Sequence, residues 1–374
     1  MPYFDHNATT VLDPRVLEVM QPYLTGPYGN ASSVHRYGRA ARDAIEAARA
    51  QVASAFGAQP NEVVWTSGGT ESNNLALKGA TDGHHPSRVL YGSTEHPSVL
   101  EAAEALTARG WHVETVAMNP HGIVAWDRFA EQLARAPLRI AAVMVANNET
   151  GVVQDVPRVA SAVHGVGALL LADAVQAAGK VPLDFAASGA DMMSLSAHKL
   201  YGPKGVGALL KRAEVELAPQ LHGGGQEHGL RGGTENLAGI VGFGAAAELA
   251  QRELQQRTQH LLRLRERLEA GLRGIEGVII FGEAAPRLPN TVQFGLAGWE
   301  GEALLMALDR KGFAVSSGSA CSSGKGQPSH VLLGMGLARD VAYRAVRVSF
   351  GVANVEEEVE RFSAVLRQHA GAGT

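Results

Sequence analysis

Short apolar runs alternate along this chain with polar loops and with stretches of helical periodicity. The first clear helical stretch lies between residues 33 and 57, where apolar residues recur every three or four positions at Ala41, Ile45, Ala48, Val52 and Ala55. Gly57 follows them, at the position where a glycine commonly ends a helix. This pattern predicts one amphipathic helix over residues 33–57.

Beyond that helix the chain repeats one unit, in which a short apolar run is followed by a polar loop and then by a helical pattern. Strands are predicted at residues 62–65, 88–91, 140–145, 168–171 and 192–195. Strands that alternate with helices indicate βαβ units and a mainly parallel sheet. A further run at 205–210 follows so closely that we expect it to return as an antiparallel hairpin strand.

A long charged helix is predicted over residues 237–271, and the pattern changes after it. Short strands are predicted there among helices, at 278–281, 291–294, 314–316 and 346–349. We therefore predict an α/β protein with two domains. The larger, mainly parallel domain spans residues 15–250, and residues 1–14 and 251–374 form a smaller α+β domain.

The amino-acid composition indicates which partners and which cellular compartment to expect. Of 374 residues, 45% are hydrophobic and 19% are charged, and the net charge of −4 comes without a basic run, which disfavours nucleic acid or an anionic membrane as a partner. The N-terminus lacks the pattern of a secretory signal, and no run of about 18 apolar residues predicts a membrane span. The single cysteine excludes an internal disulfide and fits a reducing compartment, so we expect a cytoplasmic protein.

The residues directly after the predicted strands carry an unusual set of polar groups. Because ligands bind beyond the carboxyl ends of parallel strands, we expect these residues to meet at one rim. In strand order they are Gly68, Gly69 and Thr70; Glu95 and His96; Asn147 and Asn148; Asp173 and Gln176; and Ser196, His198 and Lys199. Glycine, hydroxyl, amide, imidazole, carboxylate and amine groups in one place suit pyridoxal phosphate (PLP).

Several of these positions also have a plainer interpretation. The segment TSGGTESNN at 66–74 opens a helix, so it either cradles an anion on free N–H groups or simply caps the helix. Asp173 either keeps a pyridine nitrogen protonated or caps the following helix. Lys199 either forms a Schiff base with a cofactor or is a solvated surface lysine.

Cys321 and Arg347 are the candidates in the second half of the chain. Cys321 lies in SSGSACSSGKG, whose serines and glycines offer no apolar face, so a reactive thiolate is favoured over an inert buried thiol. Arg347 either clamps a substrate carboxylate or forms an ion pair at a sheet edge. The histidines lack the spacing of a metal site, so we expect no bound metal.

Nine segments, in order along nearly the whole chain, resemble the cysteine desulfurases of the NifS/IscS-like family, which are class V, fold-type I PLP enzymes. They are YFDHNATT at 3–10, GNASSVH at 29–35, TSGGTESNNLA at 66–76, EHPSVL at 95–100, NNETGVVQ at 147–154, DAVQAAGK at 173–180, SAHKLYGPKGVG at 196–207, HGGGQEHGLRGGTEN at 222–236 and SSGSACSSG at 316–324. The resemblance implies a fold-type I PLP-dependent transferase with a mainly parallel, seven-stranded sheet in the large domain.

The resemblance also implies roles for individual residues. Lys199 is similar to the lysine that forms a Schiff base with PLP, Cys321 to the cysteine that receives the sulfur, and His96 to the histidine that stacks on the ring and moves protons. Asp173 matches the partner of the pyridinium nitrogen, and Gln176 matches the partner of the phenolic oxygen. The phosphate-binding positions of the family match Gly69, Thr70, Ser196 and His198.

Other matches concern partners. Thr234 matches the residue that reaches the phosphate of a second subunit, which implies a homodimer with shared sites. Asn148 and Arg347 match positions near the cofactor-bound amino acid and its carboxylate.

The phosphate loop reads GGT where many relatives have GAT, which should keep the N–H cradle. The loop after Cys321 is as long as in the flexible-loop relatives, and the end at Thr374 is expected to shorten a scaffold-docking extension found in some of them.

We therefore expect a PLP-dependent cysteine desulfurase. It would convert L-cysteine to L-alanine, hold the sulfur as a persulfide on Cys321 and pass it to an acceptor protein, such as an iron–sulfur scaffold, for iron–sulfur cluster or thio-cofactor assembly. The alternatives are a selenocysteine lyase, another class V aminotransferase-like enzyme, and a non-catalytic sulfur carrier that docks through the Cys321 loop.

Overall fold

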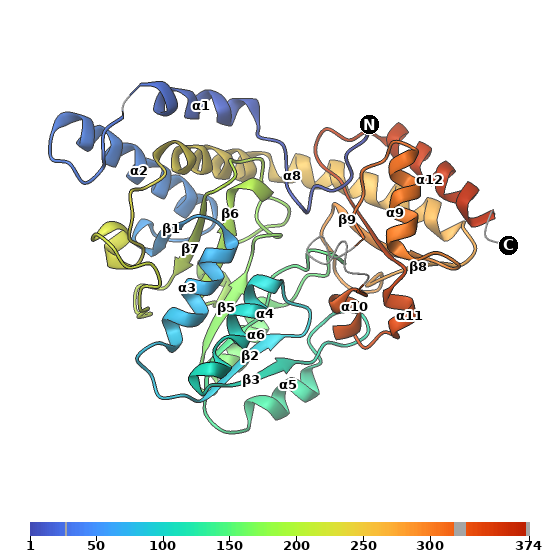
Figure 1. Cartoon of the computed structure of the whole chain (residues 1–374), viewed down its shortest axis with the longest axis horizontal. Helices are drawn as coiled ribbons and strands as arrows, with labels where there is room; N and C mark the ends of the chain where they lie inside the picture. Colours follow the sequence, from blue (N-terminus) through green and yellow to red (C-terminus); the bar gives the residue numbers. More distant parts are fainter. Residues whose placement is uncertain (27, 318–326, 372–374) are drawn as a thin grey trace.

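A seven-stranded sheet forms the centre of the larger part of the protein (Figure 1). The computed structural model describes residues 1–26, 28–317 and 327–371. The strands lie in the order β1-β7-β6-β5-β4-β2-β3. Their bounds are β1 Val63–Thr66, β2 Arg88–Gly92, β3 His112–Val116, β4 Leu138–Ala142, β5 Leu169–Asp173, β6 Met192–Ser196 and β7 Gly207–Lys211.

Strand directions place the carboxyl ends of six strands at one edge. β7 runs antiparallel to both of its neighbours, β1 and β6, which confirms the predicted hairpin return. The other neighbouring pairs are parallel, so every strand of this sheet except β7 ends on the same side. The sequence analysis missed β3, because only Val116 of this edge strand is buried and its apolar run is short.

Alternate side chains of the strands enter two apolar cores, one on each face of the sheet. In β5, Leu170 and Ala172 belong to one core and Leu171 belongs to the other. Helices α3 (Gly69–Thr81) and α4 (Pro97–Glu104) cover the face of Leu171. Helices α2 (Arg36–Ala55), α6 (Val156–His164) and α8 (Leu237–Arg273) cover the opposite face. The large unit is a three-layer α/β/α arrangement, as the alternating pattern predicted.

Helix α2 confirms the helix predicted over residues 33–57, with ends two to three residues inside those bounds. At its start, Nδ1 of His35 accepts a hydrogen bond from the backbone N–H of Gly38. At its end, Gly57 has a φ of +66° and the N–H of Ala58 reaches the carbonyl of Ala53 at 2.9 Å. This is the left-handed terminus for which glycine is favoured.

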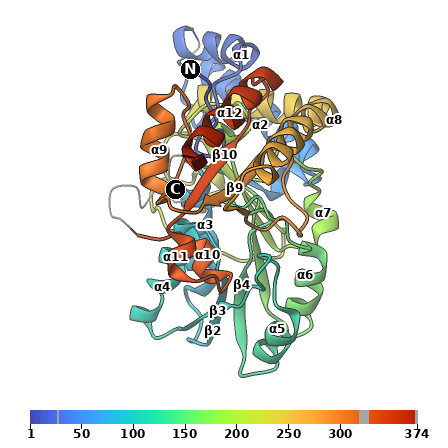
Figure 2. The ribbon, with the colours of Figure 1, turned by 90° about the vertical axis from the view of Figure 1, so that its right-hand side faces the viewer.

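A second sheet of three antiparallel strands lies at the other end of the molecule (Figure 2). It contains β8 (Val278–Ile280), β9 (Thr291–Leu296) and β10 (Ala345–Ser349), with β9 in the middle. The predicted strand at 314–316 is present only as isolated bridges, from Ala314 to Tyr3 and from Ser316 to Arg347. The remaining helices are α1 Pro14–Thr25, α5 Trp126–Leu133, α7 Phe185–Ser188, α9 Gly301–Arg310, α10 His330–Gly334, α11 Arg339–Ala342 and α12 Glu356–Gly371.

Two segments join the two sheets. Helix α8 runs along the upper edge of the molecule from the large sheet to the small one (Figure 1). The N-terminal segment lies with the small sheet, where Phe4 packs against Phe313, Phe350 and Phe362. The predicted domain boundary at residue 250 falls inside α8, which continues through it without a break. The described part of the chain contains no helix with the length and apolarity that a membrane crossing needs.

We expect the free energy of unfolding to fall as the pH is lowered from 6.5 toward 4. Burial and the nearby charge of Lys180 lower the pKa of His6 to about 4, so the unfolded chain binds a proton that the folded chain does not. For His6 alone, each pH unit in that window lowers the free energy of unfolding by up to about 1.4 kcal/mol. Urea unfolding between pH 7 and pH 5 measures the slope, which should be shallower in His6→Gln than in the wild type. The same change at the exposed His85 is the control, and equal slopes for wild type and His6→Gln would contradict the expectation.

Candidate functional site

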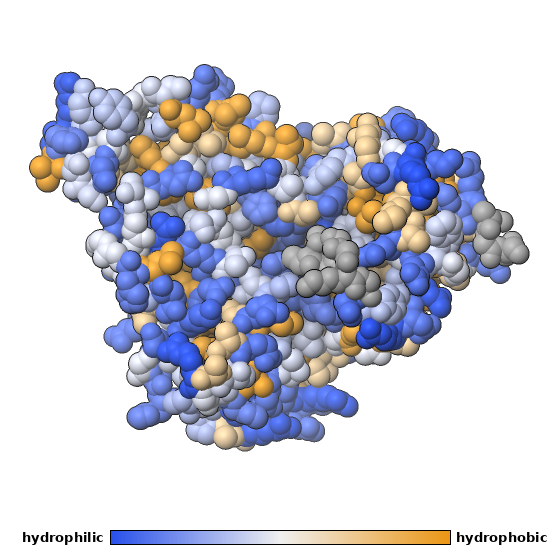
Figure 3. Space-filling model, in the orientation of Figure 1, coloured by the Kyte–Doolittle hydropathy of each residue, from blue (hydrophilic) through white to orange (hydrophobic). Residues whose placement is uncertain are grey.

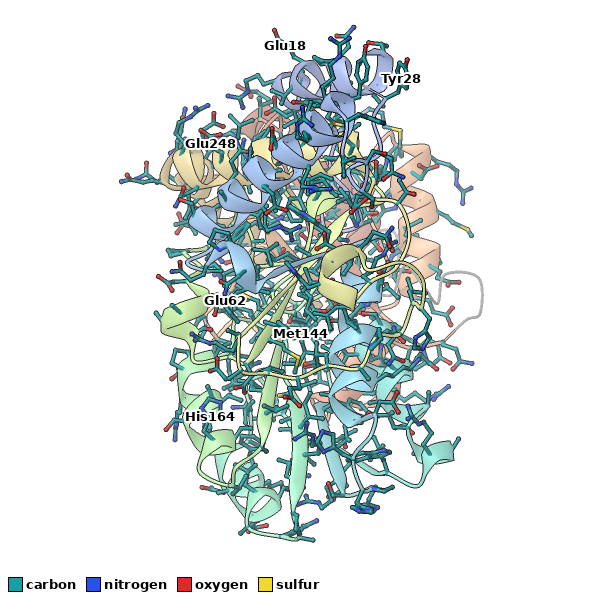
Figure 4. All side chains as sticks on the ribbon, turned by 90° about the vertical axis from the view of Figure 1, so that its left-hand side faces the viewer. Glu18, Tyr28, Glu62, Met144, His164 and Glu248 are labelled. Carbon is teal, nitrogen blue, oxygen red and sulfur yellow. The ribbon has the colours of Figure 1, made fainter. Side chains whose placement is uncertain are left out.

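A cavity opens at the edge where the parallel strands end. Nine residues that the sequence analysis placed at this rim line it: Gly69, Thr70, His96, Asn148, Asp173, Gln176, Ser196, His198 and Lys199. Asn73, Ser98, Met144 and Val175 complete the lining. Figure 4 labels Met144, which lies near the middle of the molecule in that view. The predicted convergence at one rim is therefore present in the structure.

The first turn of α3 forms one wall of the cavity. The helix begins at Gly69, and its first intrahelical bond runs from the N–H of Ser72 to the carbonyl of Gly68 at 3.1 Å. No side chain caps this end, because Gly68 occupies the capping position and Glu71 instead accepts from the N–H of Ser67. The free N–H groups of the first turn and the positive end of the helix therefore remain available to an anion.

Two glycines allow close packing around this turn. A methyl group on Gly207 would lie 2.6 Å from the Cα of Gly68, so only glycine lets strand β7 approach the turn. A methyl group on Gly69 would lie 2.7 Å from Cγ2 of Val175, across the cavity wall. Val175 can therefore pack against the start of α3 only because Gly69 has no side chain.

Asp173, at the end of β5, is buried with both carboxylate oxygens occupied. Oδ1 accepts from the backbone N–H of Val175 at 2.9 Å, and Oδ2 accepts from Nδ2 of Asn73 at 2.8 Å. Nδ2 of Asn73 also donates to Oγ of Ser98 at 2.9 Å. The sequence analysis did not identify Asn73 or Ser98, which lie within helices rather than directly after a strand.

The Asn73–Ser98 connection continues to His96. Nδ1 of His96 lies 2.8 Å from Oγ of Ser98 and accepts from the backbone N–H of Ser98 at 3.1 Å. An Nδ1 that accepts from a backbone N–H carries no proton, so Nε2 is the protonated nitrogen of the neutral ring. Burial, together with Lys199, lowers the pKa of His96 against the opposing effect of Asp173. Neutral His96 can therefore give or take a proton without starting as a cation.

Lys199 is half-buried in the short turn after β6, which does not fit a solvated surface lysine. Its Nζ donates to the backbone carbonyls of Asn7 and Ala8, the second at 2.8 Å. Both acceptors belong to the N-terminal segment, which crosses from the small sheet to the cavity. The ammonium group is thus held by main-chain oxygens at the cavity wall.

Asn7 connects the two sheets at this point, and the sequence analysis missed it. Its carbonyl also accepts from Nε2 of Gln176 at 2.9 Å. Its side chain donates to Thr291 at 2.8 Å and to the carbonyl of Asn148 at 3.1 Å, and it accepts from Asn290 at 3.0 Å. The fully buried amide therefore fixes the backbone that Lys199 and Gln176 contact.

His198 and Ser196 lie beside the first turn of α3. Nδ1 of His198 lies 3.1 Å from Oγ1 of Thr9. Burial and the charges of Lys199, Lys204 and Lys180 lower the pKa of His198 to about 4. The imidazole is therefore neutral at pH 7, and Lys199 and Lys204 supply positive charge near it.

Arg347 and Thr234, which the resemblance assigned to the site, are not part of the described cavity lining. Arg347 is buried and pairs with Asp5 at 2.6 Å, as the sheet-edge interpretation expected, while it also donates to the carbonyl of Asn148 at 3.0 Å. Thr234 is exposed on the loop before α8. Cys321 lies outside the residues that the structure describes.

Comparison with known proteins identifies the family. Residues 2–362 match the family Aminotransferase class-V. The chain belongs to this family. It is 45% identical over 368 residues to the cysteine desulfurase IscS of Anaeromyxobacter sp. (strain Fw109-5), a match that covers 96% of this chain and 89% of the relative.

Solved structures give the same result. A NifS-like protein superposes with a TM-score of 0.92 at 36% identity and covers 99% of both chains. A structure described as SspA in complex with cysteine has a TM-score of 0.83 at 32% identity, with 95% of this chain and 100% of that chain covered. The resemblance and the fold class predicted from the sequence are confirmed, and members of this family use PLP.

The cavity fits PLP. The N–H groups at the start of α3 suit the phosphate, a buried carboxylate suits a protonated ring nitrogen, and the amine of Lys199 lies at the cavity wall. Within residues 1–26, 28–317 and 327–371, no group of three His, Cys, Asp or Glu side chains is placed to hold a metal ion.

We expect Gly69→Ala to weaken PLP binding and to destabilise the protein by about 1–3 kcal/mol, because its methyl group would overlap Val175. The added change Val175→Ala removes the overlapping methyl groups and should restore both properties. Titration of the apoprotein with PLP, followed by absorbance, and thermal unfolding measure the two effects. A Gly69→Ala variant that binds PLP and unfolds like the wild type would refute the size match.

Proposed function

We propose that this chain is a PLP-dependent cysteine desulfurase, which takes sulfur from L-cysteine onto Cys321 and releases L-alanine. The observation that carries the proposal is the convergence of Lys199, Asp173 and His96 on one cavity. The sequence around Cys321 and the similarity to IscS over 96% of the chain add to it.

In this proposal, the residues at the cavity hold PLP at three points. The first turn of α3, with Thr70, binds the phosphate together with Ser196 and His198. Asp173 pairs with the ring nitrogen and keeps it protonated. Gln176 donates to the phenolic oxygen, His96 stacks on the ring, and Lys199 is the covalent attachment point.

Bound PLP supplies an electron sink for charge that develops at Cα of the substrate. Lys199, displaced by the amino group of L-cysteine, removes the proton from Cα. The carbonyls of Asn7 and Ala8, which accept from its Nζ, give the released amine a defined position. His96, neutral with its proton on Nε2, moves a second proton near the ring.

Sulfur transfer needs no outside oxidant in this scheme. The thiolate of Cys321 attacks the sulfur of L-cysteine, an S–S bond forms, and the C–S bond of the substrate breaks. The electron pair of that bond stays on the substrate carbon, which takes up a proton and becomes the methyl group of alanine. Cys321 is left as a persulfide, a reversible modification from which sulfur can be passed on.

Asn148 and Arg347 are proposed to bind the carboxylate of the substrate. The guanidinium of Arg347 donates to the backbone carbonyl of Asn148, so it lies next to the backbone of a residue that lines the cavity. Within the described residues, Oδ1 of Asn148 and Nε of Arg347 are buried without a hydrogen-bond partner. Such groups are costly to bury, and a bound carboxylate would pair with the guanidinium.

A homodimer with shared sites is also proposed. The loop that carries Thr234 is held by two ion pairs, Arg49–Glu227 at 2.8 Å and Arg231–Glu71 at 2.9 Å, and the second joins it to the helix of the phosphate wall. Exposed apolar residues gather on and after α1, where Figure 3 shows apolar atoms along the upper edge and Figure 4 labels Tyr28. They are Leu17, Val19, Leu24, Tyr28, Val34 and Tyr37. Apolar surface of this kind favours association.

The recipient of the sulfur is proposed from the resemblance in sequence. The long loop after Cys321 favours delivery to a separate acceptor protein, such as an iron–sulfur scaffold, in the cytoplasm. The number and order of the matching segments make a selenocysteine lyase or an aminotransferase the weaker alternatives.

Lys199→Ala is expected to abolish cysteine-dependent alanine formation, because it removes both the attachment point and the base. It should also remove the reducible PLP adduct from the protein. Borohydride reduction followed by peptide mass spectrometry measures the adduct, with Lys204→Ala as the matched control in the same loop. An adduct that persists on Lys199→Ala would contradict the assignment.

Cys321→Ala is expected to abolish sulfur transfer while PLP still binds, because the cysteine acts on the substrate sulfur and not on the cofactor. The visible absorbance of the variant should equal that of the wild type, whereas persulfide formation should fall to background. Release of sulfide from L-cysteine at the wild-type rate by Cys321→Ala would show that another group accepts the sulfur.

A further inference from the structure

Lys180 is a buried lysine directly behind the cavity. It lies four residues after Gln176, and its Nζ donates to Oε1 of Gln176 at 2.8 Å and to the carbonyl of Gln176 at 3.1 Å. Its side chain does not line the cavity, and only 6% of the residue is exposed. Both of these hydrogen bonds go to Gln176, which does line the cavity.

The charges around Lys180 favour its neutral form. Burial and the neighbouring cations Lys199 and Arg347 lower its pKa well below the ordinary value of lysine, and His6 is the further titratable group that it faces. A neutral amine has two N–H donors in place of three. Two donors match the two oxygens of Gln176, so the contacts satisfy the neutral amine.

These contacts fix the orientation of the Gln176 amide. Lys180 donates to Oε1, and a flipped amide would take this acceptor away from Nζ and set Oε1 against the carbonyl of Asn7, two acceptors face to face. With Oε1 held by Lys180, Nε2 points the other way and donates to the carbonyl of Asn7 at 2.9 Å. That carbonyl is also an acceptor for Lys199. The second N–H of Nε2 is left for an acceptor on the cavity side.

We propose that Lys180 is a positioning residue, which holds the amide of Gln176 so that Nε2 donates to an anionic oxygen of bound PLP. The inference rests on the proposed function, because it names the contact that Gln176 makes with the cofactor. Lys180 acts only through Gln176 and touches neither cofactor nor substrate.

The test is the pH titration of the visible absorbance of the PLP-loaded protein. A donor to the deprotonated oxygen favours the unprotonated form of the chromophore, so loss of the donor should raise the pKa of the spectral transition. We expect a rise of about one unit in Lys180→Met, the size of one hydrogen bond to a charged group. Lys211, a half-buried lysine on β7, donates to the backbone carbonyls of Arg212 and Ala213. Lys211→Met is the matched control and should titrate like the wild type.

A double-mutant cycle separates action through Gln176 from a direct effect of charge. In a Gln176→Ala background, Lys180→Met should shift the transition no further. An equal shift in both backgrounds would overturn the inference, because Lys180 would then act without Gln176.

Stability gives a second readout. Burial disfavours the charged form of Lys180 and lowers its pKa, so Lys180→Met, which removes a polar group that loses its hydration on folding, is expected to unfold at the same or a higher temperature than the wild type. If Lys180→Met does not fold, Lys180→Leu offers a second apolar replacement with the same expected spectral shift.

A wild-type protein that forms no coloured adduct with PLP would defeat the proposed function itself. A coloured wild type with an unshifted Lys180→Met would defeat only the role of Lys180.

Discussion

The backbone carbonyl of Asn7 accepts hydrogen bonds from Lys199 and from Gln176, and the site depends on where that carbonyl is held. Asn7 comes from the N-terminal segment, which pairs with the small sheet, whereas the two donors follow strands of the large sheet. Its buried side chain bonds to Asn290 and Thr291 next to β9. A shift between the two sheets would therefore move the lysine and the amide together, which couples the packing of the whole chain to the cavity.

Around that carbonyl, the cavity combines one buried carboxylate with several basic groups. Lys180, Lys199 and His198 all lie near one another, and burial together with the charge of Lys199 lowers the pKa values of Lys180 and His198. An anionic ligand at the first turn of α3 would offset part of this positive charge. Asp173, held by Asn73 and the N–H of Val175, is the carboxylate of the cavity lining. A helix N-terminus and a carboxylate in one cavity suit a cofactor that has a phosphate and a protonated ring nitrogen.

The sequence alone predicted the residues at the rim of the cavity but not the residues that hold them in position. His96, Asp173 and Lys199 could be predicted because each directly follows an apolar strand, and parallel strands end together. Asn7 could not, because its partners lie 141 to 342 residues away and only folding reveals them. Lys180 looks like any surface lysine until its burial is known. β3 was not predicted because an exposed edge strand lacks a full apolar run. The sequence left two interpretations of Arg347 open, an ion pair or a carboxylate ligand, and only the structure shows its contacts with Asp5 and Asn148.

The central claim is that one sulfur atom moves from L-cysteine to Cys321 while the carbon skeleton leaves as alanine. The most direct measurement is a single turnover of the PLP-loaded protein with L-cysteine labelled with heavy sulfur. Mass spectrometry then analyses the Cys321 peptide, and amino-acid analysis identifies the small product. The account predicts one labelled sulfur on Cys321 for each molecule of alanine formed. A keto acid in place of alanine, or labelled sulfide in solution with an unmodified Cys321 peptide, would contradict it.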